Sequence, residues 1–297
     1  MHLKSWSLQS RSARWESNQR VENISDFRKK IIFAILMVAS FITAMSTTVT
    51  GNMIPNMMAY FEVSSSAAQW LTSGATLLSG ITIPVTAFLI KNVPNKAYFL
   101  TAIGLFTAGS LVASLANKFA LLLIFRLVQA MGCGMLLSFA QVLILAMFPK
   151  EKHGTMMAVY SMAASVSSMV GPTYAGLLMD YVGWRGVFAS LFAVGCLLLV
   201  SGFIFVKNVL PKQEASINIG YVLLSSAGFA AFIIGLNQMP KGFFRISSGG
   251  CMAFGIMLLA TFSVLQLRSN APMLNVTVFK NEENVIYTQF TPYKYAI

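Results

Sequence analysis

Long apolar runs separated by short polar stretches dominate this chain. A membrane span needs about 20 mainly apolar residues, and eight runs are long enough to form one. We place these spans at residues 31–54, 68–90, 97–116, 119–147, 155–179, 186–206, 217–239 and 247–267. Because the connections are short, consecutive spans are expected to lie antiparallel and next to each other. The pattern predicts an all-α polytopic membrane protein.

The composition indicates the same class. The chain has 297 residues, of which 56% are hydrophobic and 10% charged, whereas soluble domains carry about 25% charged residues. The net charge of +12 could indicate a nucleic-acid partner, but the basic residues lie between apolar runs and do not gather on one polar face. The expected partner is therefore the lipid bilayer, with no nucleic acid.

The positions of Lys and Arg predict the orientation, because cytoplasmic loops carry an excess of both. If the N-terminus is cytoplasmic, the outer loops hold only Lys118, Arg185, Lys241 and Arg245. We therefore expect a multi-pass protein of the plasma membrane with both termini in the cytoplasm. The predicted parts are a basic cytoplasmic tail (1–30), a six-span bundle (31–206), two additional spans (207–267) and a cytoplasmic C-terminal segment (268–297).

Groups suited to catalysis are scarce in this sequence. The acidic residues lie in tails, in loops or at the ends of spans, so no buried carboxylate can act as a general acid or base. His2 and His153 stand alone, and the three cysteines lie singly in apolar runs. We expect no metal, no cofactor and no enzymatic activity.

One apolar run contains a proline that needs an explanation. The stretch "SMVGPTYAGLLMDYVGWRGVF" (168–188) places Gly171 and Pro172 inside a predicted helix, where a proline costs about 3 kcal/mol. Small residues recur around it at spacings of three and four, which lets a neighbouring backbone approach closely in lipid. Two interpretations stay open: a packing hinge, or a tight pair of static helices.

Four stretches in the right order resemble the major facilitator superfamily. The positions Gly171, Pro172, Gly176, Trp184 and Arg185 match the fifth-span antiporter motif of that superfamily. The other three are "RLVQAMGCG" (126–134), similar to the fourth-span motif, "AQWLTSGATLLSGITIPVTAFLI" (68–90), similar to the second span, and "NAPMLNVTVFKN" (270–281). The last resembles the segment after two extra central spans in the fourteen-span drug:proton antiporters, the EmrB/QacA-like multidrug transporters.

The resemblance implies two six-helix bundles around a cavity that opens alternately to each side. This chain would supply the N-terminal bundle and the two extra helices, with the C-terminal bundle missing. The implied activity is proton-coupled multidrug efflux, an antiport of protons against small apolar or cationic compounds, with a second half-transporter chain as a possible partner. The alternative is a truncated, non-transporting membrane protein or an interaction partner that keeps the fold.

Arg126 is the one basic residue deep within a predicted span, about 10 Å from its outer end at 1.5 Å per residue. A charge at the centre of a lipid-embedded helix costs roughly 2.5–3.5 kcal/mol, so Arg126 is expected to face protein or water. The resemblance implies a place beside the cavity and a part in proton transfer, with Gln129 on the same helix face. The alternative is that Arg126 extends along its own helix to the outer surface.

The first span departs from the pattern of the relatives. Many of them carry a carboxylate at the position of Ser46 or Thr47, close to Asn52 and Pro55. A hydroxyl does not titrate near neutral pH and cannot carry a proton as a carboxylate can. The predicted proton and substrate pathway, Arg126, Gln129, Ser46, Thr47 and Asn52, therefore lacks an acid of its own.

Overall fold

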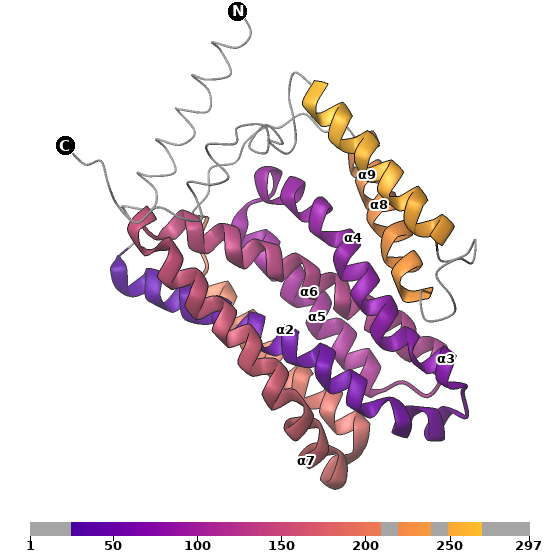
Figure 1. Ribbon diagram of the computed structural model, residues 1–297. Coiled ribbons are helices and arrows are strands. Elements are labelled where there is room, and N and C mark those ends of the chain that lie inside the picture. The colour runs from indigo at the N-terminus through magenta and orange to yellow at the C-terminus, as the bar shows by residue number, and fades with distance from the viewer. Residues whose placement is uncertain (1–24, 209–218, 239–248, 269–297) are drawn as a thin grey trace, which may run out of the picture. The chain divides into compact units, whose positions relative to one another are not determined.

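The computed structural model describes residues 25–208, 219–238 and 249–268, and these ranges contain helices and no strand (Figure 1). The helices are α2 (Asp26–Phe61), α3 (Ser65–Ala68), α4 (Trp70–Asn92), α5 (Asn95–Ser114), α6 (Phe119–Met147), α7 (Lys150–Phe205), α8 (Ile219–Gln238) and α9 (Cys251–Arg268). The prediction of an all-α protein is confirmed. Most of the predicted tail (1–30) and nearly all of the predicted C-terminal segment (268–297) lie outside the described residues.

Several helices have the length and composition of membrane spans. Among the described residues, α2, α5, α6 and α7 are long and apolar enough to cross a bilayer, and 223–236 and 251–265 form shorter apolar helices. The helix α7 has 56 residues, nearly three times the roughly 20 that one span requires. These features fit a polytopic membrane protein.

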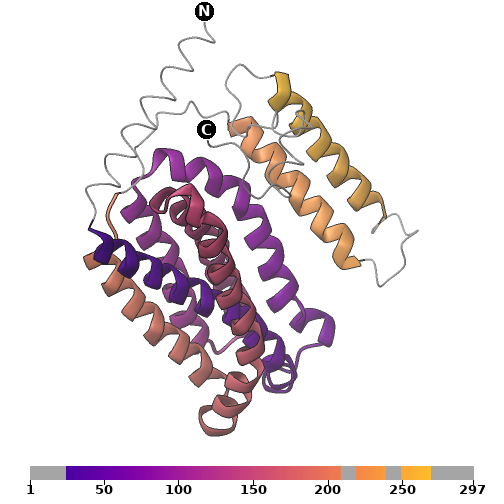
Figure 2. The ribbon, with the colours of Figure 1, turned by 60° about the vertical axis from the view of Figure 1, so that its left-hand side comes forward.

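The helix α7 is divided at Gly183. This residue has φ 68° and ψ −179°, a combination that essentially only glycine adopts. Figures 1 and 2 show that the chain reverses near the end of the first half of α7 and returns beside it. The predicted spans 155–179 and 186–206 are therefore the two arms of α7, one on each side of this break.

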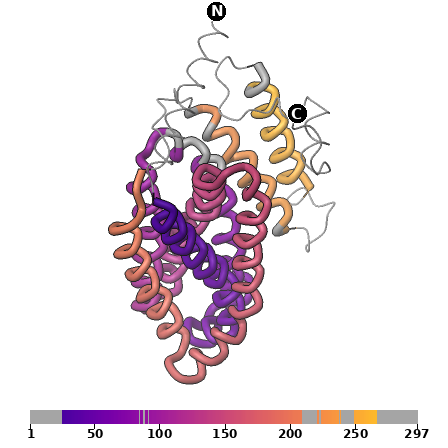
Figure 3. Tube along the Cα trace, turned by 90° about the vertical axis from the view of Figure 1, so that its left-hand side faces the viewer, coloured from indigo at the N-terminus to yellow at the C-terminus, as the bar shows by residue number. Residues whose placement is uncertain are grey.

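The first compact unit of the chain, up to residue 215, contains α2 to α7. The helix α2 packs against α7, and α6 packs against both α4 and α5. In Figure 3 the indigo α2 is seen between the two arms of α7. One apolar cluster, which includes Leu36, Phe99, Phe139 and Val206, packs α2, α5 and α6 against the end of α7. A second, which includes Met53, Leu122 and Phe188, joins α2, α6 and the second arm of α7.

Aromatic rings gather beside the break in α7. Trp184 lies 5.5 Å from the ring centroids of both Tyr60 and Phe61 at the end of α2, and Phe61 lies 6.0 Å from Phe119 at the start of α6. Such edge-to-face and tilted pairs contribute about 0.5–1.5 kcal/mol each beyond burial. The reversal of α7 is thus held against the ends of two other helices.

The helix α2 begins at Asp26, inside the predicted tail. Ser25 caps it by accepting a hydrogen bond from the Arg28 backbone N–H at 3.4 Å, and Asp26 lies in the first turn, where a negative charge is favourable. Lys29 Nζ lies 3.6 Å from the Asp26 carboxylate. The prediction assigned these residues to a tail because they are polar. In the structure, the Ser25 cap and the Lys29–Asp26 pair extend the helix beyond its apolar part.

The second compact unit contains α8 and α9, which pack against each other. Both helices contribute glycines to their contact. A Cβ on Gly235 would lie 2.6 Å from the Met252 backbone nitrogen, and one on Gly255 would meet the Phe232 backbone. This close approach fits two of the predicted spans, 217–239 and 247–267, paired as a helical hairpin.

Replacing Gly183 with Ala is expected to destabilise the first unit. The open space around Gly183 would accept a methyl group, so the penalty comes from forcing φ 68° and ψ −179° on an L-residue, about 1–3 kcal/mol. The measurement is the apparent Tm of the detergent-solubilised chain.

Gly176→Ala is the matched control on the same helix, because Gly176 is helical and nothing lies within 4 Å of an added Cβ. This variant is expected to keep or slightly raise the Tm, since alanine favours a helix over glycine by about 1 kcal/mol. An unchanged Tm in Gly183→Ala would mean that this backbone geometry is not required.

Candidate functional site

Arg126 lies in the interior of the first unit, with 1% of its surface exposed. Its NH1 atom donates to the Ser46 hydroxyl at 3.1 Å and to the Gln129 side-chain oxygen at 2.6 Å. Its NH2 atom donates to the Ser46 carbonyl at 3.2 Å. The guanidinium therefore extends from α6 to α2 and does not reach the outer surface, which excludes the alternative orientation along its own helix.

Gln129 carries the network on to α5. Its side-chain nitrogen donates to the Ser110 hydroxyl at 2.7 Å, and Ser110 donates in turn to the Phe106 carbonyl at 2.8 Å. Gln129 and Ser110 are both fully buried. Three helices thus meet through one chain of hydrogen bonds, Ser46 to Arg126 to Gln129 to Ser110.

The absence of a side chain at Gly109 allows α5 and α6 to meet here. A Cβ on Gly109 would lie 2.7 Å from the Phe125 carbonyl oxygen and 2.8 Å from the Gln129 backbone nitrogen. One turn farther along α6, a Cβ on Gly132 would lie 2.5 Å from the Ala102 carbonyl oxygen. Backbone atoms cannot move aside as a flexible side chain can. These two glycines therefore set the distance across which Gln129 reaches Ser110.

The charge of Arg126 is balanced by dipoles and not by a carboxylate. Among the described residues the one ion pair joins Lys29 and Asp26 at the start of α2, far along the helix from Ser46. The Arg126 Nε is buried without a hydrogen-bond partner. A guanidinium offers five N–H donors and accepts nothing. The site therefore has unused donor capacity for an anionic or carbonyl group.

None of the side chains in this network can take up a proton near neutral pH. Arginine stays charged, and a serine hydroxyl or a glutamine amide does not titrate in that range. The network can orient and stabilise a negative charge. It can also lower the free-energy cost of burying an ionised carboxylate beside it. It cannot by itself act as a proton carrier.

Thr47 and Asn52 do not join this network. Both are exposed on α2, while the neighbouring Ser46 is buried, so they lie on a different side of the helix. The structure brings three of the five predicted pathway residues together and leaves these two on the surface of the first unit. Their place in a pathway stays a prediction.

The predicted hinge residues divide between two faces of α7. A Cβ on Gly171 would collide with the Thr48 hydroxyl of α2, and Ser167 and Ala175, four residues before and after, are fully buried. Pro172 and Gly176 are exposed. The close contact with α2 therefore involves Gly171, whereas Pro172 and Gly176 face away from it.

Trp184 and Arg185 hold the break in α7 in place. Arg185 NH2 donates to the Tyr60 hydroxyl at 2.9 Å, to the Ala116 carbonyl at 3.0 Å and to the Asn117 side-chain oxygen at 3.1 Å. Its guanidinium also lies 4.8 Å from the ring centroids of Tyr60 and Trp184. Arg185 thus links α2, the connection between α5 and α6, and α7.

Sequence reasoning missed Ser110 and the role of Gly109. Ser110 is one of many serines in an apolar run, and its partner Gln129 is 19 residues away. The only signal was the pair "GS" in the middle of a span, a small residue beside a hydroxyl, which is compatible with close helix contact but does not identify the opposite helix.

Comparison with known proteins identifies the fold. The profile described as Major Facilitator Superfamily matches residues 36–279, most of the chain. The chain belongs to the major facilitator superfamily. Its helices α2 to α7 and the buried Arg126 network are therefore those of a superfamily member.

Two curated relatives come from Bacillus subtilis (strain 168). The uncharacterized MFS-type transporter YhcA is 33% identical over 250 residues, which cover 84% of this chain and 47% of YhcA. The lincomycin resistance protein LmrB is 30% identical over 257 residues, which cover 84% of this chain and 53% of LmrB. The chain thus spans about half the length of the curated relatives that it matches.

A solved structure gives the same picture of the fold. A mutant of the peptide transporter POT in complex with alafosfalin has a TM-score of 0.63 and 13% sequence identity, over 86% of this chain and 56% of that one. At this identity the likeness shows the fold alone. It supports the major facilitator architecture for the arrangement of α2 to α7.

Ser110→Ala is expected to destabilise the first unit by about 1–3 kcal/mol, because the buried Gln129 side-chain nitrogen loses its acceptor. Ser114→Ala is the control, since the Ser114 hydroxyl donates only within its own helix, to the Leu111 carbonyl at 2.7 Å. The apparent Tm of the purified chain should fall for the first variant and change little for the second. Equal changes would contradict a bridging role for Ser110.

Proposed function

We propose that this chain is the N-terminal half of a drug:proton antiporter of the major facilitator superfamily. The expected activity is efflux of small apolar or cationic compounds in exchange for protons. Relatedness to a protein named for lincomycin resistance supports drug export, and lincomycin is the first compound to test. The branch with fourteen spans remains the one that the segment 270–281 resembles, although that segment lies outside the described residues.

The observation that carries this proposal is the buried, unpaired charge of Arg126. A charged side chain among membrane-spanning helices is costly, and such residues commonly mark a pathway for ions or substrates. A purely structural role could be filled by a neutral polar side chain that makes hydrogen bonds to Ser46 and Gln129 without the cost of burying a charge. The charge is therefore best explained by transport.

Proton coupling then requires an acid from outside the Arg126 network. The resemblance would place the carboxylate of many relatives at Ser46 or Thr47, and neither hydroxyl titrates near neutral pH. The proton carrier in this proposal belongs to the second bundle or to the substrate itself. In alternating access one bundle rocks against the other, so the second bundle is needed for turnover as well.

The proposed location is the plasma membrane with both termini in the cytoplasm. The distribution of Lys and Arg supports this orientation, since Lys118 and Arg185 fall on the predicted outer side with few other basic residues. A cysteine-accessibility test at exposed Lys118, replaced by Cys, would show labelling from outside intact cells if the orientation is right.

A second candidate function is a non-transporting membrane protein that keeps the fold. The uncharged pair Ser46 and Thr47 favours it, because a coupling carboxylate is absent from that position. The two candidates differ in one measurable property. Drug accumulation in sensitised cells falls only if the chain, alone or with a second half, turns over.

The decisive experiment measures lincomycin and cationic-dye accumulation in drug-sensitised bacteria. The chain is expressed alone and together with a separately encoded C-terminal half of LmrB, with and without a protonophore. Reduced accumulation that the protonophore abolishes supports antiport. Normal membrane levels without any change in accumulation, in both settings, would leave the non-transporting alternative.

Arg126→Met separates a transport role from a structural one. The apolar side chain removes the buried charge at similar length, but it leaves the Gln129 side-chain oxygen without its donor, so the Tm is expected to fall about as far as in Ser110→Ala, which serves as the stability-matched control. Efflux is expected to fall at least tenfold, because the donors aimed at Ser46 and Gln129 are lost. A variant with full efflux would remove the main support for the proposal.

Gly171→Leu tests the packing hinge. The side chain would collide with Thr48, so α2 and α7 could not keep their contact, and efflux is expected to be lost at nearly normal membrane levels. Gly176→Leu is the control within this bundle, because nothing lies within 4 Å of its Cβ. A functional Gly171→Leu variant would refute the need for close contact there.

A further inference from the structure

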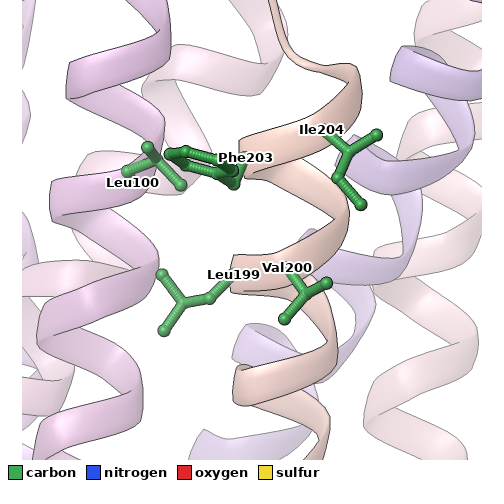
Figure 4. Close-up of a pocket in the computed structure, with 5 residues that line it drawn as sticks. All are labelled: Leu100, Leu199, Val200, Phe203 and Ile204. Atoms are coloured by element: carbon green, nitrogen blue, oxygen red, sulfur yellow. The ribbon is translucent and has the colours of Figure 1, made fainter.

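A groove on the surface of the first unit lies between α5 and the second arm of α7. It has a volume of about 470 Å³ and is lined by Leu100, Leu199, Val200, Phe203 and Ile204 (Figure 4). All five side chains are aliphatic or aromatic, and Figure 4 shows Leu100 on α5 facing Leu199 and Phe203 across the groove. Val200 and Phe203 are exposed by 59% and 64%. The groove therefore presents apolar surface to the surroundings of the chain.

The groove has a positive charge at one end. The Lys96 ammonium lies 4.3 Å from the centroid of the Phe203 ring, a cation–π contact that places the charge against the groove wall. The Lys96 backbone N–H donates to the Asn208 side-chain oxygen at 3.0 Å, which ties the start of α5 to the segment after α7. Lys207, next to Asn208, is exposed. Two lysines thus accompany this end of the groove.

This charge is not neutralised within the described part of the chain. The carboxylates there belong to Asp26, Glu62, Glu151 and Asp180, and the one ion pair they form is with Lys29. Among the described residues, the Lys96 ammonium contacts the face of the Phe203 ring and forms no ion pair. An anion that approached from the polar end of the groove would meet Lys96 first.

An apolar slot that ends at an unpaired cation is complementary to one kind of molecule that a bilayer supplies. An anionic phospholipid has an acyl chain that can fill the slot and a phosphate-containing head group of net negative charge at the right end. A zwitterionic lipid matches the slot equally well but carries a cation beside its phosphate. Selectivity would therefore come from the lysines, at about fivefold per lysine near a membrane surface.

We infer that this groove is a binding site for an anionic phospholipid, with one acyl chain against Val200 and Phe203 and the head group at Lys96 and Lys207. The site is separate from the Arg126 network, because it faces outward between α5 and α7 while Arg126 is enclosed between α2, α5 and α6. It adds a lipid partner that the proposed transport activity does not require.

The test compares retention of two lipids by the full chain. The purified, delipidated protein is incubated with phosphatidylglycerol or phosphatidylcholine of identical acyl chains, and bound lipid is counted by native mass spectrometry. Phosphatidylglycerol is expected to be retained more strongly. Equal retention of the two lipids would overturn the inference.

Variants locate the site. Lys96→Gln should lower the preference for phosphatidylglycerol about fivefold, whereas Lys96→Arg should keep it, which guards against a simple folding defect. Lys118→Gln removes an exposed lysine at the connection before α6 and should have no effect. If Lys118→Gln lowers the preference as much as Lys96→Gln does, the lipid responds to overall charge and the site is refuted.

The apolar half of the site has its own pair of variants. Val200→Trp fills the groove and should reduce retention of both lipids several-fold. Leu197→Trp is the control, because Leu197 is 70% exposed on the same arm of α7 but does not line the groove. Equal loss in both variants, or loss in neither, would show that the groove does not hold an acyl chain.

Discussion

The rest of the first unit depends on the close approach of α5 and α6 at Gly109. In a bilayer the hydrophobic effect does not drive helices together, so contact at backbone distance has to supply the packing. Because Gly109 has no side chain, Gln129 lies directly against α5 and can donate to Ser110. That bond holds the Gln129 oxygen in place for Arg126, and Arg126 in turn reaches Ser46 on α2. One absent methyl group thus permits three helices to share one polar network.

The network is unusual in its charge balance. A buried arginine normally stands opposite a carboxylate, yet here a hydroxyl, a carbonyl and an amide share that place. Dipoles compensate a charge less completely than an ion of opposite sign, so the first unit keeps a net attraction for negative charge in its interior. This makes the bundle responsive to any carboxylate that comes close, whichever chain or ligand provides it.

The sequence predicted the spans well and the site only in part. The lengths of the apolar runs predicted every described helix that is long enough to span a membrane. The spacing of three residues predicted that Gln129 lies beside Arg126 on the same helix face. The family resemblance placed Ser46 in the same pathway as Arg126, but the residues alone could not show that Ser46 and Ser110 are hydrogen-bond partners. They lie 80 and 19 residues from the groups they bind, and contacts between helices have no local signature. The five residues before the first apolar run were predicted as tail, because hydropathy does not register the Ser25 cap. The sequence also did not identify Gly183 as the break in α7. Many glycines can adopt a positive φ, and only the packing of the whole fold determines which one does so.

Arg185 fastens three segments together at one end of the bundle. It binds Tyr60 near the last turn of α2 together with the connection between α5 and α6, so these segments are fastened at a common corner. At 1.5 Å per residue the 36 residues of α2 extend about 54 Å from that corner. The other end of α2 is held as well, because Leu36 packs in the cluster with Phe99, Phe139 and Val206. A tilt of α2 about the Arg185 corner would therefore have to carry α5, α6 and the end of α7 with it.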